Sequence, residues 1–101
     1  MATRMDLHKV LHDILGSSNV YYQPPESMKI KYPAIVYFLD NVDFLFADNI
    51  KYKRMDRYTI QLITRDPEPN FIDDILELNY CNFERSYVTD NLNHFIFEIF
   101  W

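Results

Sequence analysis

The strongest constraint in this sequence is the segment 34–64, which has the pattern of one long β-hairpin. Residues 34–39 form a continuous apolar run, which predicts a strand buried on both faces or in the centre of a sheet. Residues 42–46 predict a second strand segment, and 47–49 predict a turn, because Asp and Asn tolerate left-handed backbone geometry. Residues 50–64 then predict the return strand, whose second half alternates between two faces.

A helix is expected before the hairpin, where apolar residues recur at helical spacing. Thr3 and Asp6 resemble a capping box at its start. Gly16, the only glycine in the chain, is expected to end the helix in the left-handed conformation. The apolar stripe of this helix consists of Leu7, Val10, Leu11, Ile14 and Leu15.

The remaining elements follow from shorter patterns. Residues 20–22 predict a short strand, and a helix is expected from Asn70, its candidate N-cap, to about Asn79. Residues 83–89 and 94–101 predict a last hairpin with its turn at 90–93. The order favours a single domain over residues 1–101, of the α+β class: a mostly antiparallel sheet with a long hairpin and both helices packed on one face.

Composition excludes several classes of function. The chain has 101 residues, 49% of them hydrophobic and 17% aromatic, so it has enough apolar surface to fold. A single glycine leaves no glycine-rich phosphate loop, and a single cysteine leaves no internal disulfide. The net charge of −5 disfavours nucleic acid as a default ligand. No transmembrane run or secretory signal is evident, so we expect synthesis and use in the cytosol of the host cell.

Two constellations could carry chemistry through histidine. His8 and His12 share a helix face and could offer two nitrogens to a metal, but zinc sites need three or four ligands. Cys81 and His94 could be posed as nucleophile and base, but a thiolate needs a basic or dipolar environment. We expect a half-exposed helix flank in the first case and a small structural cysteine in the second.

Two pairs of carboxylates could be read as acid–base catalysts. Such pairs work when a shared pocket separates their pKa values. Asp73 and Asp74, or Asp40 and Asp43, are such candidates. Adjacent helical residues point in different directions, and the first pair is explained by the N-terminus of its helix. We therefore predict that the protein is not an enzyme and has no catalytic residues, cofactor or metal.

The only basic cluster lies on the return strand of the hairpin, as Lys51, Lys53, Arg54 and Arg57, with Tyr52 and Tyr58 between them. Basic and aromatic residues together can bind a nucleic-acid backbone, or they can form a solvated strand face. A third interpretation is a protein–protein contact, because the opposite strand of the hairpin carries exposed apolar residues rimmed by charge. The residues that we predict for a subunit interface are Phe44, Leu45, Phe46, Lys51, Tyr52, Lys53 and Arg54.

Several sequence segments resemble those of the tail terminator or tail completion family, which are small tail proteins of long-tailed bacteriophages. They are YPAIVYFLDNVDFLFADN, YTIQLITRDPEP, FIDDILEL and NLNHFIFEIF. Residues 32–40 match a proline-preceded strand, 46–48 match an aromatic-Ala-Asp tip, and 58–64 match an alternating strand. The resemblance covers nearly the whole chain.

The resemblance implies a structural virion subunit with a mixed sheet and two helices. It implies a homo-oligomer, a hexameric ring that caps the tail tube, halts its polymerisation and offers a surface to a neck or head-completion protein. Such a subunit is assembled in the host cytoplasm and resides in the virion tail, with DNA only as transit cargo and no membrane partner. Another head–tail joining or neck adaptor protein and a nucleic-acid-binding adaptor remain as alternatives.

Overall fold

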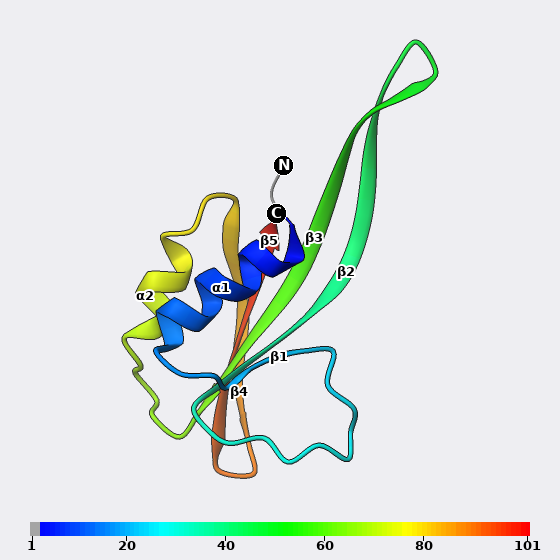
Figure 1. Cartoon of the computed structure of the whole chain (residues 1–101). Helices are drawn as coiled ribbons and strands as arrows, with labels where there is room; N and C mark the ends of the chain where they lie inside the picture. Colours follow the sequence, from blue (N-terminus) through cyan, green and yellow to red (C-terminus); the bar gives the residue numbers. More distant parts are fainter. Residues whose placement is uncertain (1–2) are drawn as a thin grey trace.

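The long hairpin dominates the computed structural model, which describes residues 3–101 except the side chains of Leu45, Phe46, Ala47, Lys51 and Tyr52. Five strands form one sheet, and two helices lie beside it (Figure 1). In chain order the elements are α1 (Arg4–Leu15), β1 (Val20–Tyr22), β2 (Ala34–Ala47), β3 (Ile50–Thr64), α2 (Phe71–Leu76), β4 (Cys81–Thr89) and β5 (Leu92–Phe100).

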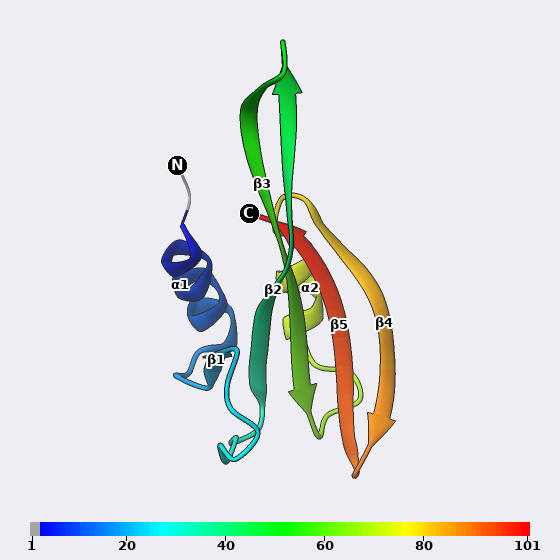
Figure 2. The same ribbon diagram turned by 90° about the vertical axis from the view of Figure 1, so that its right-hand side faces the viewer.

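The strands lie in the order β1-β2-β3-β5-β4 (Figure 2). β1 runs parallel to β2, and the other three neighbouring pairs are antiparallel. The predicted α+β class, with a mostly antiparallel sheet and two helices, is confirmed. β1 and β4 are the two edges of the sheet, so only β2, β3 and β5 have a neighbour on each side.

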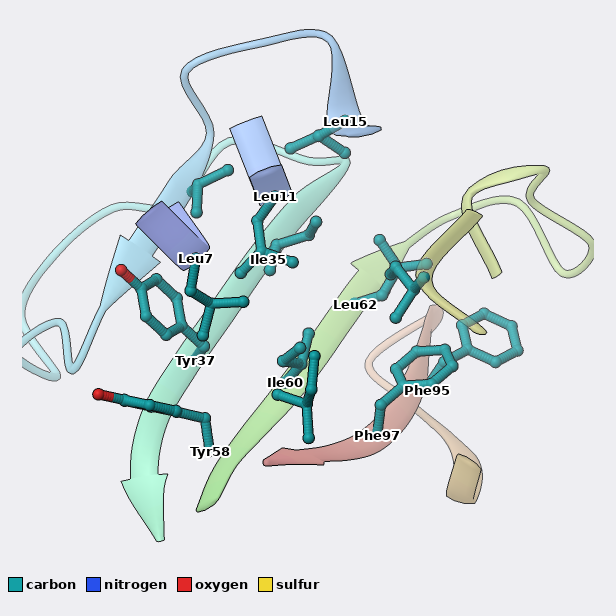
Figure 3. Close-up of a cluster of buried hydrophobic side chains, with 13 residues drawn as sticks. Leu7, Leu11, Leu15, Ile35, Tyr37, Tyr58, Ile60, Leu62, Phe95 and Phe97 are labelled. Atoms are coloured by element: carbon teal, nitrogen blue, oxygen red, sulfur yellow. The ribbon is translucent and has the colours of Figure 1, made fainter. Parts of the chain in front are cut away.

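The buried core lies between the sheet and the helices, as Figure 3 shows. Side chains alternate between the two faces of a strand, so every second residue of β2, β3 and β5 faces the helices. The alternation expected in the second half of residues 50–64 is confirmed, because Tyr58, Ile60 and Leu62 all belong to this core. β5 contributes Phe95, Phe97 and Ile99 to it. The helices contribute Leu7, Leu11, Leu15 and Ile75.

Of the two interpretations of residues 34–39, a strand inside the sheet is confirmed, because β2 lies between β1 and β3, whereas burial on both faces is wrong. Ile35 and Tyr37 are fully buried under the helices, whereas Phe38, on the opposite face, is 38% exposed. The reason is that both helices pack on one side, which leaves the other side of the sheet uncovered. We call this uncovered side the open face. The two predicted segments are one strand, whose pairing register shifts between Leu39 and Asn41.

Helix α1 begins and ends as the sequence predicts. The Thr3 side chain accepts a hydrogen bond from the Asp6 backbone N–H, and the Asp6 carboxylate accepts one from the Thr3 N–H at 2.9 Å. This capping box satisfies two backbone donors that a helix start leaves free, and it lowers the pKa of Asp6. Gly16 follows the last turn with φ of 73° and donates its N–H to the His12 carbonyl.

Replacing Gly16 with alanine is expected to lower the free energy of unfolding by about 1 kcal/mol. An added Cβ would meet no atom within 4 Å, so the cost comes from the positive φ alone. Chemical denaturation of both proteins measures the difference. Gly16→Asn is the matched variant, because asparagine tolerates this conformation, and it should cost less than alanine. An alanine variant as stable as the wild type would contradict the left-handed cap.

The other boundaries differ from the predicted ones by a few residues. Asn70 occupies the N-cap position of α2, but its side chain makes no capping hydrogen bond, and the helix ends at Leu76 rather than near Asn79. The turn of the last hairpin is Asp90–Asn91 rather than 90–93. Both turn residues have positive φ, which allows a two-residue turn and adds two residues to β5.

Candidate functional site

Beyond the body of the sheet, β2 and β3 continue as a bare two-stranded hairpin (Figures 1 and 2). β2 and β3 pair as far as Ala47 and Ile50, but β5 pairs with β3 only from Arg57 onwards. β1 pairs with β2 only at residues 35–37. Within residues 3–101, the segment 41–56 therefore has no third strand beside it, and we call this segment the arm. It contributes to a longest dimension of 51 Å for the molecule.

All seven predicted interface residues lie in the two strands of the arm. Among those whose side chains are described, Phe44 is half-buried, and Lys53 and Arg54 are exposed. Leu45, Phe46, Lys51 and Tyr52 belong to the predicted set, but their side chains lie outside the described residues. At the tip, Ile50 is 70% exposed, in agreement with a tip that lies beyond the core.

Lys53 and Arg54, the basic residues of the arm whose side chains are described, do not share one face. Lys53 and Arg54 are neighbours in an extended strand, so their side chains leave opposite faces of the hairpin. The Arg54 Nε donates to the Asp56 carboxylate at 2.6 Å, which offsets one of the two charges. A nucleic-acid backbone needs cations on one face, whereas a partner that packs against both faces or along an edge can use this arrangement.

Several contacts hold the base of the arm in place. On the β2–β3 ladder, the Arg57 Nε donates to the Asp40 carboxylate at 2.8 Å. Trp101 donates its backbone N–H to the Asp56 carbonyl at 2.9 Å and its indole Nε1–H to the Thr3 carbonyl at 2.8 Å. Thr3 and Trp101, at the two ends of the described chain, thus meet at the base of the arm. These contacts tie the base of the arm to the body of the protein.

A polar cluster also lies between α1 and the sheet, on the face that the helices cover. The Arg4 guanidinium donates to the Tyr37 hydroxyl oxygen at 3.1 Å, and that hydroxyl lies 2.7 Å from His8 Nδ1. Since the hydroxyl already accepts from Arg4, its own hydrogen is available for His8. Arg4 also lies 4.3 Å from the centre of the Tyr22 ring, and Tyr58 packs edge-on against Tyr22.

This cluster was not predicted, because nothing in the local sequence around Arg4 and His8 links them to a tyrosine in β2. Only the folded structure reveals it: Tyr37 is fully buried, and its hydroxyl group is nevertheless hydrogen-bonded. Burial raises the pKa of Tyr37 and lowers the pKa of His8, which the Arg4 charge lowers further. The cluster therefore fixes α1 on the sheet beside the arm.

The open face carries a second polar group around His94. The Gln61 side-chain amide lies 3.0 Å from the Tyr87 hydroxyl and 2.8 Å from His94 Nδ1. The Tyr87 and His94 rings stack with their centres 4.6 Å apart. His94 Nε2 is buried and has no hydrogen-bond partner among the described residues. Burial lowers the pKa of His94, so the imidazole is held neutral.

Acidification is expected to destabilise the folded protein below about pH 6.5. The folded pKa values of His8 and His94 lie below the unfolded value of 6.5. The unfolded chain then binds more protons as the pH falls, so the stability present above this pH is lost below it. Denaturation midpoints between about pH 7.5 and about pH 5.5 measure this slope. His94→Gln should reduce it, because a titrating group with a lowered folded pKa is then absent.

The structure does not assemble the alternative sites considered from the sequence. His8 Nδ1 is engaged by Tyr37, and within residues 3–101 no three His, Cys, Asp or Glu side chains are grouped to hold a metal ion. Cys81 and His94 lie near opposite ends of the β4–β5 ladder, and Cys81 packs on the helix side. Burial raises the pKa of the Cys81 thiol to about 11, which opposes thiolate formation.

Comparison with known proteins leaves the resemblance as a prediction. No family model matches the chain, and no curated protein matches it in sequence. Neither α1 nor α2, the helices of the described chain, is long and apolar enough to cross a membrane.

Proposed function

We propose that this chain is a structural subunit that forms a ring on the tail tube of a long-tailed bacteriophage and joins the tube to the neck. The observation that carries the proposal is the arm, a two-stranded extension on a well-packed α+β body. A lone hairpin is marginally stable in water, so an arm of this length calls for a partner surface. The proposed partners are further copies of the chain, the tail tube protein and a neck or head-completion protein.

Ring formation follows from the shape of such a subunit. When the arm of one copy contacts a different surface of the next copy, the contact is head-to-tail, and repeated rotation closes it into a ring. Exposed Lys53 and Ile50 on the arm provide polar and apolar contact area, as the rims and cores of protein interfaces do. The net charge of −5 disfavours adhesion of DNA that passes through the lumen.

The mass of the purified protein, measured at several concentrations with and without assembled tail tubes, tests the proposal. Rings in solution, or binding confined to tube ends, would support a tail terminator and give the number of subunits. Binding to neck proteins but not to tubes would favour the neck adaptor. A monomer that ignores tubes and shifts on duplex DNA in a salt-dependent manner would favour the nucleic-acid adaptor.

A further inference from the structure

Strand β4 leaves a long edge of the sheet unpaired. It is the outermost strand on its side, and β5 is its only neighbour (Figure 2). Eight of its nine residues are exposed, and Cys81 is half-buried. An unpaired edge presents a row of backbone N–H and C=O groups, which is a template for another strand. The chemistry of the ligand is therefore defined: it is an extended backbone.

The second half of β4 lacks the usual protection of an edge strand. Natural edges are blocked by charges, prolines or bulges. The register shift between Phe83 and Arg85, with the charged Glu84 there, protects the first half. Residues 86–89 carry no charge and no proline, and their pairing with β5 is regular. Val88 is 68% exposed on this stretch, so the edge offers apolar contact as well as hydrogen bonds.

The turn fixes which backbone groups point outwards. In a hairpin with a two-residue turn, the residues that flank the turn, here Thr89 and Leu92, form a hydrogen-bonded pair. Hydrogen-bonded and non-hydrogen-bonded pairs alternate along an antiparallel ladder. The pair of Val88 with Asn93 is therefore of the second kind, and Val88 directs its N–H and C=O away from β5.

We propose that the β4 edge receives the arm of a second copy of this chain, through main-chain hydrogen bonds that extend the sheet. This inference rests on the proposed ring and names its receiving surface. The arm lacks a third strand, and β4 lacks an outer neighbour. Within one chain the arm extends beyond the top of the sheet while the β4 edge faces sideways, with β5 between β3 and β4 (Figure 2). Each copy thus offers one arm as the donor and one β4 edge as the acceptor.

Opposite charges on the arm and on β4 favour this occupant, and the small contact area favours a ring over a dimer. Lys53 on the arm and Glu84 on β4 are both exposed, and neither forms a salt bridge within the described part of the chain. Pairing over the four residues 86–89 would extend roughly 14 Å along a sheet about 10 Å thick. This contact is smaller than the ~800 Å² per partner of a stable dimer. A ring, in which each copy makes two such contacts, compensates for a weak single contact.

Two variants separate the arm from the edge. Val88→Pro removes the outward N–H but no bond of the β4–β5 ladder, and Val88→Thr is its matched control, with the same shape and an intact N–H. The arm variant replaces residues 44–54 by Asn-Gly, which joins the cross-strand partners Asp43 and Met55 by a two-residue turn. Circular dichroism and thermal melting establish that each variant folds, and Val88→Lys, a charge on the edge, serves if the proline variant does not.

Sedimentation and native mass spectrometry up to about 1 mM protein, with and without tail tubes, then measure assembly. Val88→Pro should raise the dissociation constant of the oligomer at least about tenfold, and Val88→Thr should not change it. Each variant alone should be monomeric. A mixture of Val88→Pro with the arm variant should form a one-to-one heterodimer and nothing larger, because only one complete contact remains.

The other outcomes separate this inference from the proposed function. An oligomer that survives Val88→Pro or Val88→Lys overturns the edge pairing and leaves the ring in place. Dimers of the arm variant alone would show that β4 pairs with β4. Rings that persist in the arm variant alone would exclude the arm as the occupant. A wild-type chain that stays monomeric at every concentration and with tubes contradicts the proposed ring itself.

Discussion

Replacement of Phe97 by alanine is expected to lower the free energy of unfolding by about 3–5 kcal/mol. Phe97 is fully buried in β5 beneath the helices. Its cross-strand partners are Ile60 in β3 and Phe83 in β4, and the Phe83 ring meets it edge-on with centres 5.5 Å apart. Removal of the ring leaves a cavity in the core beside Ile60 and Phe83, and a close-packed site relaxes poorly. Chemical denaturation with a linear extrapolation measures the loss.

The effect is large because domains of this size are stable by only about 5–15 kcal/mol, so the variant should be close to unfolding near body temperature. Ile50→Ala is the control, since Ile50 is 70% exposed at the arm tip and its truncation should change the stability by less than about 0.5 kcal/mol. A loss below about 1 kcal/mol at Phe97 would mean that the core is not packed as the structure has it. Equal losses at both positions would mean that the arm tip is part of the folded core.

The sequence predicted those parts of the fold that local physics determines. The alternation along β3 identified its core face, because a strand has a side-chain period of two. Gly16 and the Thr3–Asp6 pair identified the ends of α1, since each satisfies backbone groups within one turn. Asp48 and Asn49 identified the tip, because both adopt positive φ in a two-residue turn.

What the sequence could not predict depends on contacts between distant segments. Nothing local indicates that β1 lies parallel to β2, or that β5 inserts between β3 and β4. The exposure of Phe38 has the same origin: a continuous apolar run does not reveal that both helices choose one face. The Arg4–Tyr37 hydrogen bond joins residues 33 positions apart, so no local sequence motif could predict it.

The candidate site was located by the sequence, but its partners were not. The seven residues predicted for a subunit interface lie on the arm, and the interface itself stays a prediction. The pairing of Arg54 with Asp56 follows only from side-chain geometry. The β4 edge was not identified, although a signal exists: residues 86–89 contain none of the charges or prolines that natural edges use.

Charge reversal on the arm is the second large effect that we expect. Lys53→Glu together with Arg54→Glu should raise the dissociation constant of the proposed ring at least about tenfold, because the acidic side chain at position 53 would then repel Glu84 of the neighbouring copy. Folding should be little affected, since the Arg54 side chain of the Arg54–Asp56 salt bridge is 56% exposed and surface pairs contribute about 0–1 kcal/mol. Sedimentation at two salt concentrations measures the effect, which salt should weaken.

Net charge alone could also change assembly, so the control must carry the same charge. Lys29→Glu with Lys31→Glu makes the same double reversal at exposed positions of the loop before β2, away from the arm. If both double variants lose assembly equally, repulsion between whole subunits is the cause and the arm has no special part. If only the arm variant loses assembly, and added Lys at Glu84 (E84K) restores it, the arm of one copy meets β4 of the next. Restoration requires the two opposite charges to lie within about one Debye length of each other, which no contact between other surfaces would provide.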